Sequence, residues 1–269
     1  MTRPFTFLSD YGLGDEFVGV VHAVIARIAP DARVIDIGHG VPRQDARAGA
    51  LMLARAVPYA PAGVHLAVVD PEVGARRRAI AVRTAEEDRL LVGPDNGLLM
   101  LAAERFGGVT EAVEISTSPW RLERVSATFH GRDLFAPVAA RLALGEPLAA
   151  GGTPLDPGEL VTIELPSAVV EDGAVQATVT GVDGFGNAVL GAGQDDLARA
   201  GLTLGHPFAA RAGGRRVGGV VARTFADVRR GELLVYEDAG GTLALAVNNG
   251  DAAALLGVGS GDEVRLERR

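Results

Sequence analysis

Three side chains able to do chemistry follow strand-like apolar runs in the first half of the chain: Asp10, His39 and Asp70. In an open α/β sheet, ligands bind beyond the carboxyl ends of the strands. A carboxylate there can accept hydrogen bonds from a substrate or act as a general base, although any one of them could equally form a turn. Three strand ends together favour a site. His39, between two glycines, is interpreted as a loop residue.

Two further residues are weaker candidates when taken alone. Arg77 lies in a short basic run, and its guanidinium would supply a permanent positive charge. His130 precedes Gly131, which permits close backbone approach to a ligand. The segment around His130 leads into an apolar helix, so Ser126 or Asp133 could simply cap that helix.

The second half of the chain carries turn-like segments that could recognise a purine. In the segment 183–187, Asp183 and Asn187 flank an aromatic ring, Phe185, that stands between two glycines. Purines are bound by stacking on a ring and by hydrogen bonds to an amide. An ordinary β-turn is the simpler alternative. The Asn248-Asn249-Gly250 segment is expected to form a turn, and Phe225 is expected to lie in the hydrophobic core.

Alternating strand-like and helix-like patterns must position the first set. Apolar spacing predicts helices over 17–28, 47–57, 97–106 and 134–144. Buried strands are predicted over 4–9, 33–37, 65–69, 79–83 and 90–92. This alternation is typical of a mostly parallel sheet covered by helices.

The pattern changes near residue 147. A Gly- and Pro-rich stretch without periodicity predicts a linker. Short β-like runs between glycines then favour a small antiparallel barrel; they cover 161–165, 175–182, 217–222, 233–236 and 243–247, with a short helix over 251–256. We therefore predict an α/β domain over 1–148, a linker over 149–160 and a smaller C-terminal antiparallel β-barrel over 161–269.

The amino-acid composition excludes several kinds of chemistry. The 269 residues include no cysteine, and all 26 basic residues are arginine. Thiol nucleophiles, Schiff-base lysines and a P-loop lysine are therefore excluded. The net charge of −8 argues against a nucleic-acid or anionic-membrane partner. With no membrane-spanning run and no basic-then-apolar leader, a cytoplasmic protein is expected.

Seven segments, in order along nearly the whole chain, carry a family resemblance: FLSDYG, VVDPEVGARRRAI, GPDNGLL, SATFHGRD, VDGFGN, TFADV and AVNNG. Together they resemble the S-adenosylmethionine (SAM) hydrolases, or SAM hydroxide adenosyltransferases, relatives of the fluorinase and chlorinase. The resemblance implies an α/β domain joined to a β-barrel, in a homotrimer with active sites between subunits. It also implies that water attacks ribose C5′ of SAM, giving adenosine and L-methionine, without a cofactor or metal.

The resemblance also assigns roles. The hydrolases carry an Asp–Arg–His set, matched here by Asp70, Arg77 and His130, that the halogenases lack. Hydrolysis is therefore preferred to halogenation. Substrate-binding roles match seven further residues, with Asp10 on the ribose hydroxyls, Asp183 on the methionine ammonium, and Phe185, Asn187, Phe225, Asn248 and Asn249 around adenine.

One segment departs from the family pattern. A serine, an aromatic or arginine, and Gly-Tyr often precede the last strand, where this chain has Ala239-Gly240-Gly241-Thr242. The methionine carboxylate is therefore expected to be bound either more loosely or through backbone amides. Two other classes stay open: a metal-dependent hydrolase using Asp10, His39, Asp70 and His130, and a non-catalytic adenosine or SAM sensor.

Overall fold

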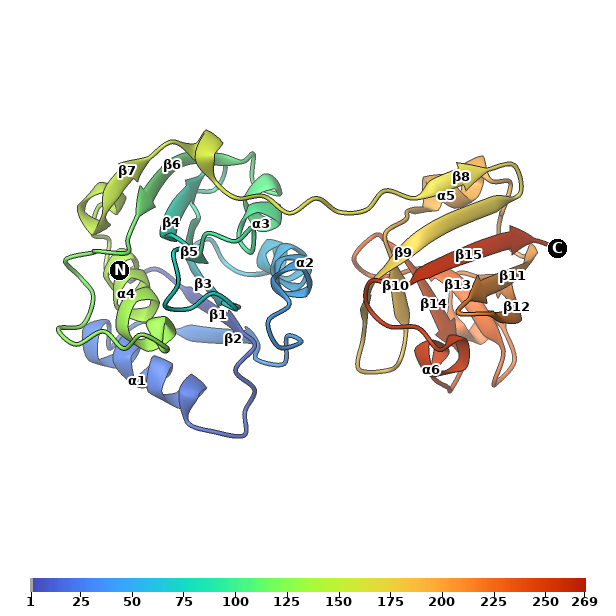
Figure 1. Cartoon of the computed structure of the whole chain (residues 1–269), viewed down its shortest axis with the longest axis horizontal. Coiled ribbons are helices and arrows are strands. Elements are labelled where there is room, and N and C mark those ends of the chain that lie inside the picture. Colours follow the sequence, from blue (N-terminus) through green and yellow to red (C-terminus); the bar gives the residue numbers. More distant parts are fainter. Residues whose placement is uncertain (1) are drawn as a thin grey trace. The chain divides into compact units, whose positions relative to one another are not determined.

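The computed structural model describes residues 2–269 and separates the chain into two compact units, Met1–Ile163 and Glu164–Arg269. The first unit is a three-layer α/β domain (Figure 1). Its seven-stranded sheet has the order β2-β1-β3-β5-β4-β6-β7. The strands are β1 (Phe5–Ser9), β2 (Val34–Gly38), β3 (Val64–Val68), β4 (Ala79–Thr84), β5 (Leu90–Pro94), β6 (Val109–Glu114) and β7 (Thr153–Leu155).

The neighbouring strands β2, β1, β3 and β5 run parallel, and β4, β6 and β7 extend the sheet antiparallel. The predicted fold class is thus confirmed, with parallel strands in the half of the sheet that carries Asp10 and Asp70. The alternating pattern missed β6 and β7, which are the antiparallel edge of the sheet.

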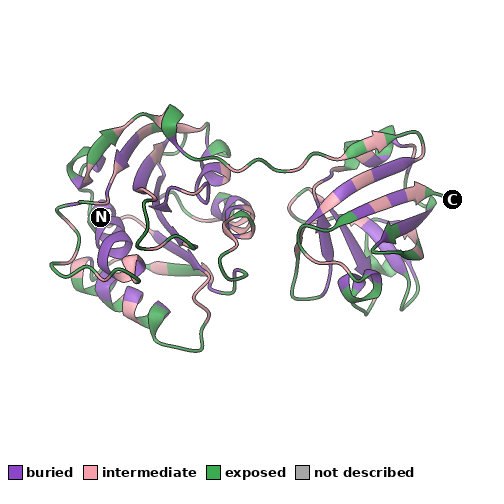
Figure 2. Ribbon diagram, viewed as in Figure 1, coloured by how far each residue is buried: buried purple, intermediate pink, exposed green. Residues whose placement is uncertain are grey.

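Helices cover both faces of this sheet (Figure 1). α1 (Phe17–Ile28) and α4 (Ala136–Ala143) pack on one face, and α2 (Ala46–Ala56) and α3 (Met100–Glu104) on the other. In α1 the buried side chains Val18, Val21, Val24 and Ile25 recur at helical spacing, which explains why this segment is a helix. Figure 2 shows the buried residues concentrated on the strands and the inner helix faces.

The second unit is a closed barrel. Seven strands form the ring, which closes because β9 pairs with both β15 and β10. Among the described residues, β12 and β13 are the one parallel pair of this ring. The barrel strands are β9 (Ala174–Val182), β10 (Ala188–Leu190), β11 (Pro207–Ala212), β12 (Arg215–Val221), β13 (Leu233–Glu237), β14 (Leu243–Val247) and β15 (Glu263–Arg268). The short strand β8 (Val169–Glu171) pairs with β9, and α5 (Gln194–Arg199) and α6 (Ala252–Leu256) connect strands.

The segment between the two units differs from the expected linker. Residues 153–155 form β7, paired with β6, and a one-turn helix, Pro157–Glu159, follows it. Asp95 accepts a hydrogen bond from the Val161 amide at 2.9 Å, so this stretch belongs to the first unit. No strand forms over 161–165, where one was predicted; residues 161–168 carry no regular secondary structure.

Among residues 2–269, none of the helices has both the length and the apolar character needed to cross a membrane.

A buried histidine makes the first unit sensitive to acid. His65 on β3 lies 2.9 Å from Thr6 Oγ1 through Nδ1, and Arg89 donates to its Nε2 at 3.1 Å. A ring that accepts from arginine at Nε2 is neutral and carries its proton on Nδ1. Burial, followed by the charge of Arg89, lowers the pKa of His65 to about 3.

Because the folded-state pKa of His65 is lowered, the unfolded chain binds the proton first as the pH falls. The free energy of unfolding should therefore decrease by about 1.4 kcal/mol per pH unit below about pH 6.5, on account of this residue. We expect His65→Gln, which keeps a donor and an acceptor, to remove that part of the slope. Denaturant unfolding followed through Trp120, the single tryptophan, measures it. His206→Gln, which replaces an exposed histidine, is the control and should keep the wild-type slope. A wild-type slope in His65→Gln would contradict the prediction.

Candidate active site

Asp70 lies at the point where the strand order reverses. From β1 the chain passes through α1 to β2 on one side, then through α2 to β3 on the other. Adjacent parallel strands whose connections leave in opposite directions open a crevice at their carboxyl ends, where ligands bind. Asp10 follows β1 and Asp70 follows β3, so both residues come after the carboxyl ends of the two strands at this reversal.

Arg77 binds Asp70 through two of its nitrogens. Arg77 Nε donates to Asp70 Oδ1 at 2.9 Å and to Oδ2 at 3.0 Å, and a terminal nitrogen makes a shorter contact with Oδ2. Their side chains are only 4% and 5% exposed. The guanidinium also lies over the ring of Phe135, 5.2 Å from its centroid. Such a buried, bidentate pair holds both groups in one orientation.

His130 completes the group through the same guanidinium. Arg77 Nη2 lies 2.8 Å from His130 Nδ1 and can only donate. His130 precedes a π-helical turn, Gly131–Phe135, that leads into α4; such turns occur often at functional sites. Burial and then the charge of Arg77 lower the pKa of His130, against smaller opposing effects of Asp70 and Asp133.

Two loops must meet to bring Arg77 to His130. Gly74 has φ +78°, and a Cβ there would lie 2.4 Å from the carbonyl oxygen of Ala127, so only glycine permits this approach. Asp133 closes the second loop by accepting from the Ser126 amide at 2.7 Å. Asp133 therefore organises the loop that carries His130, beyond the simple capping role considered from the sequence.

Tyr11 is a residue of this site that sequence reasoning passed over. Burial, then the charges of Asp10 and Asp70, raise its pKa above the ordinary value. A Cβ on Gly131 would lie 2.0 Å from the Tyr11 hydroxyl, so that hydroxyl packs directly against the backbone beside His130. Its position immediately after Asp10 was the available signal. Asp10 Oδ2 itself accepts from the Gln44 amide at 2.9 Å.

The metal-ligand set considered from the sequence is not assembled. Within residues 2–269, the group of His, Asp and Glu side chains close enough to share a cation is His22, Asp36 and His39. Asp10, Asp70 and His130 do not belong to it. The buried His39, expected to be a loop residue, lies just after β2 with Nδ1 2.8 Å from Ser9 Oγ.

In the barrel, Asp183 organises the turn that carries Phe185 and Asn187. Its Oδ1 accepts from the amides of Phe185 at 2.8 Å and of Asn187 at 3.0 Å, and its Oδ2 accepts from Asn187 Nδ2 at 2.8 Å. Asn187 is buried, whereas Phe185 is 82% exposed. The turn therefore presents an aromatic ring to solvent and fixes the amide beside it.

Phe225 and Asn248 belong to a neighbouring part of the barrel. Phe225 packs on Tyr236, with ring centroids 5.1 Å apart, and Asn248 Nδ2 donates to the carbonyl of Val228 at 2.8 Å. Burial, then Asp183 and Asp238, raise the pKa of Tyr236. Phe225, which sequence alone placed in the core, is 38% exposed. Tyr236, which sequence reasoning did not select, is the ring against which Phe225 packs.

Two further turns of the barrel contain residues that were considered in the sequence analysis. Asn249 is exposed at φ +61°, a conformation that asparagine tolerates. The segment 239–242 is held by Asp238, whose carboxylate accepts from the amides of Gly240 at 2.8 Å and Thr242 at 3.0 Å. Among the described residues, the buried Thr242 hydroxyl has no hydrogen-bond partner.

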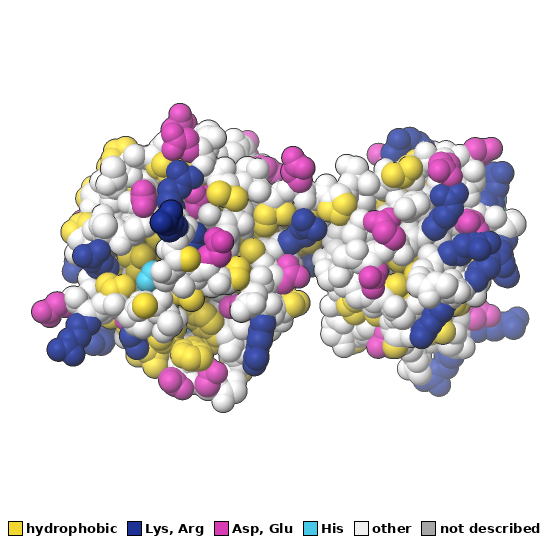
Figure 3. All heavy atoms as spheres, in the orientation of Figure 1, with side chains coloured by type: hydrophobic (Ala, Val, Ile, Leu, Met, Phe, Trp, Pro, Cys, Tyr) yellow, Lys and Arg dark blue, Asp and Glu magenta, His cyan; other side chains and the backbone are white. Residues whose placement is uncertain are grey.

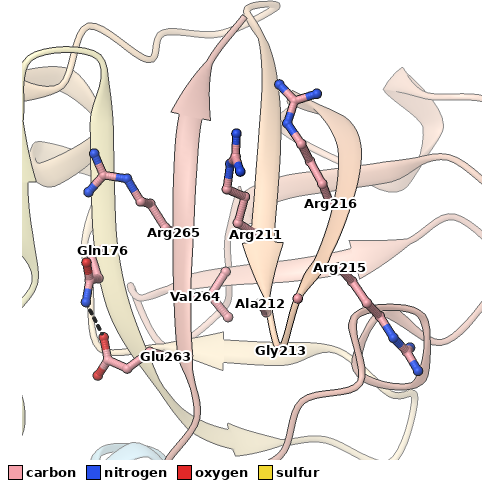
Figure 4. Close-up of a pocket in the computed structure, with 10 residues that line it drawn as sticks. Gln176, Arg211, Ala212, Gly213, Arg215, Arg216, Glu263, Val264 and Arg265 are labelled. Atoms are coloured by element: carbon pink, nitrogen blue, oxygen red, sulfur yellow. Dashed lines mark hydrogen bonds between the residues drawn. The ribbon is translucent and has the colours of Figure 1, made fainter.

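A hollow on another face of the barrel is lined by arginines, including Arg211, Arg216 and Arg265 (Figure 4). Arg211 is paired with Glu267, and Arg265 is paired with Glu171 and Glu267. Much of the positive charge of the hollow is therefore neutralised. On the face seen in Figure 3, basic and acidic side chains are likewise interspersed. None of the predicted site residues lines this hollow.

Together these observations define a two-unit α/β and β-barrel protein with a buried Asp–Arg pair, joined to a partly buried histidine, at a strand-order reversal. The chain matches the SAM hydroxide adenosyltransferase N-terminal domain over residues 5–152 and the C-terminal domain of that family over 177–265. The chain belongs to the SAM hydroxide adenosyltransferase family.

Relatives support this membership. The (R)-S-adenosyl-L-methionine hydrolase of Salinispora tropica is 52% identical, covering 97% of this chain and 96% of that protein. The enzyme of the same name from Thermus thermophilus is 42% identical, over 98% of this chain and 99% of that protein. The fluorinase of Actinopolyspora mzabensis is 28% identical, over 99% of this chain and 98% of that protein. A crystal structure of a conserved protein from Thermotoga maritima superposes with a TM-score of 0.90, at 40% identity, over 98% of this chain and 100% of that one.

Proposed function

We propose that this chain hydrolyses S-adenosyl-L-methionine to adenosine and L-methionine, by attack of water on ribose C5′. The observation that carries the proposal is the buried Asp70–Arg77–His130 group at the reversal of strand order. The substrate is inferred from the chain's family, in which relatives are named SAM hydrolases.

The reaction needs little acid–base assistance at the leaving group. SAM carries a sulfonium, so methionine leaves as a neutral thioether while the C5′–S electron pair returns to sulfur. The new bond forms between water oxygen and C5′, and one proton is released. What the site must supply is a water aligned behind C5′, opposite the sulfur, and shielded from other water.

The hydrogen bonds support different tasks for the three groups. Because Arg77 donates to His130 Nδ1, the neutral ring carries its proton on Nε2 and would donate to the attacking water. Asp70 would then accept the released proton, and Arg77 would hold its carboxylate in one orientation. In this proposal His130 is a water-positioning residue and Asp70 is the base.

The binding roles follow the family resemblance. Asp10 would accept from the ribose hydroxyls, and adenine would rest against Phe185, Asn187, Phe225, Asn248 and Asn249. Asp183 would receive the methionine ammonium. A carboxylate offers about four lone-pair positions, and three are used within the turn, so one on Oδ2 is free for this purpose. The amides of Gly240, Gly241 and Thr242 all donate to Asp238, so this turn would hold the methionine carboxylate through them only after releasing those hydrogen bonds, and looser binding is the simpler proposal.

We also propose a homotrimer whose active sites lie between neighbouring subunits, and a cytoplasmic location. The resemblance to the SAM hydroxide adenosyltransferases supports the homotrimer, and the exposed ring of Phe185 is accessible to a neighbouring subunit.

The pH profile should report on His130. Because its pKa is lowered, the neutral ring that accepts from Arg77 persists below pH 6.5, and kcat/KM should fall only at more acidic pH. Protonation would place two cations side by side at Nδ1. We expect His130→Gln to lower activity about 10²-fold and to abolish this acid limb. An acid limb of unchanged position in the variant would contradict the assignment.

Incubation with SAM, followed by chromatography, tests the proposed function. Adenosine and methionine should form in equal amounts, with or without chloride or fluoride, and in the presence of a chelator. A 5′-halogenated nucleoside would instead indicate a halogenase, and loss of turnover with the chelator a metal-dependent hydrolase. Binding of SAM without product would indicate a sensor and refute the proposal.

A further inference from the structure

We propose that His22, Asp36 and His39 bind one divalent transition-metal ion of the zinc type. His22 lies on α1, Asp36 on β2, and His39 directly after β2. Asp36 Oδ1 is 2.9 Å from His22 Nε2 and 3.1 Å from His39 Nε2, and the three atoms lie within 4.8 Å of one another. This site is separate from the residues proposed for hydrolysis.

The strongest observation concerns His39 Nε2. The His39 side chain is only 3% exposed, and among the described residues its Nε2 has no hydrogen-bond partner despite the short distance to Asp36. A buried polar atom without a partner is destabilising, so such an atom calls for an explanation. The His22–Asp36 hydrogen bond alone leaves Nε2 unsatisfied.

The hydrogen bond on the other side of the ring points to the same answer. His39 Nδ1 lies 2.8 Å from Ser9 Oγ, and Ser9 Oγ accepts from the Tyr11 amide at 3.3 Å. In the tautomer that carries the proton on Nδ1 and donates it to Ser9, Nε2 presents a lone pair toward the carboxylate oxygen of Asp36. Two acceptors facing each other repel, and a cation bound by both removes the repulsion. Metal-binding histidines characteristically donate their other nitrogen in this way.

The donor set selects the kind of ion. Two imidazole nitrogens and one carboxylate oxygen suit Zn²⁺ or its neighbours rather than Mg²⁺ or Ca²⁺. In a tetrahedral site with bonds of about 2.0–2.1 Å, ligand atoms lie about 3.3 Å apart, close to the two separations here. His22 and Asp36 are 33% and 43% exposed, so solvent can reach a fourth position.

The surroundings favour a structural role. Phe7 packs against the rings of His39 and His22, at centroid distances of 4.7 and 6.1 Å, and so fixes both donors. The His39 carbonyl accepts from the Gly12 amide at 2.7 Å. An ion at His39 would therefore join α1 to the edge strand β2.

Titration of the chelator-treated full chain with Zn²⁺ and Co²⁺ tests this. By calorimetry we expect one Zn²⁺ per chain, and with Co²⁺ the intense visible absorption of a tetrahedral site. His22→Ala, at a partly exposed helix position, should weaken Zn²⁺ at least tenfold, as should Asp36→Asn. His206→Ala, which removes an exposed histidine of the barrel, is the matched control and should bind as wild type does.

Three results would overturn the proposal: no saturable Zn²⁺ binding by the wild type below millimolar concentration, unchanged affinity in His22→Ala, or equal weakening in His206→Ala. Thermal unfolding without metal shows whether His22→Ala is folded. If it is not, Asp36→Asn decides the matter by the same comparison.

Discussion

Asp70→Asn is expected to lower the turnover number for SAM about 10²- to 10⁴-fold, the range typical of removing a catalytic base. Asparagine keeps the shape of the side chain but has no negative charge to receive the proton of the attacking water. It also replaces one acceptor oxygen by an NH₂ group that faces the donors of Arg77. Steady-state release of adenosine at saturating SAM measures the effect, and binding of SAM should persist.

Glu111→Gln is the matched control, because Glu111 is an ion-paired carboxylate of the same unit, bound to Arg83 on the antiparallel side of the sheet. It should leave turnover within about twofold, since a partly exposed ion pair contributes little. A turnover of Asp70→Asn similar to that of this control would refute the role given to Asp70.

Arg77→Met should lower both activity and stability. The guanidinium is the donor to both Asp70 oxygens and to His130, so its loss leaves a buried carboxylate without a partner. Breaking a buried pair in this way costs about 3–5 kcal/mol. We expect a loss of that size in the free energy of unfolding, followed through Trp120, with turnover reduced at least as far as in Asp70→Asn.

The double variant separates the two effects. Asp70→Asn combined with Arg77→Met removes both charges. The double variant should therefore lose less free energy of unfolding than the two single losses add up to, while its activity stays low. Arg83→Met, which breaks a more exposed ion-pair group, should cost about 1 kcal/mol or less. Equal losses in Arg77→Met and Arg83→Met would show that the buried pair has no special weight.

The sequence predicts the parallel half of the first sheet well, because those strands are mostly apolar segments that alternate with amphipathic helices. β6 escapes that pattern: Val109–Glu114 has neither a continuous apolar run nor strict alternation, and no predicted helix directly follows it. The segment 161–165 alternates apolar and polar residues as a strand does, but it pairs with none, because it connects the two units. Periodicity reports burial and cannot show which partner a segment finds.

Within the site, only the strand-end positions of Asp10 and Asp70 follow from local pattern. Arg77 and His130 lie on irregular loops 53 residues apart, and their contact depends on Gly74 packing against Ala127. Such long-range packing leaves no periodic signal. The resemblance to a family, carried by seven short segments, supplied these two residues. Their catalytic roles stay predictions until the variants are measured.

Oxygen labelling tests the central claim most directly. A single turnover of SAM in H₂¹⁸O, with enzyme in excess, should place ¹⁸O on the 5′-hydroxyl of all the adenosine formed, as read by mass spectrometry. Unlabelled adenosine would mean that a protein oxygen, such as that of the Asp70 carboxylate, attacked C5′ first, and would contradict direct attack by water.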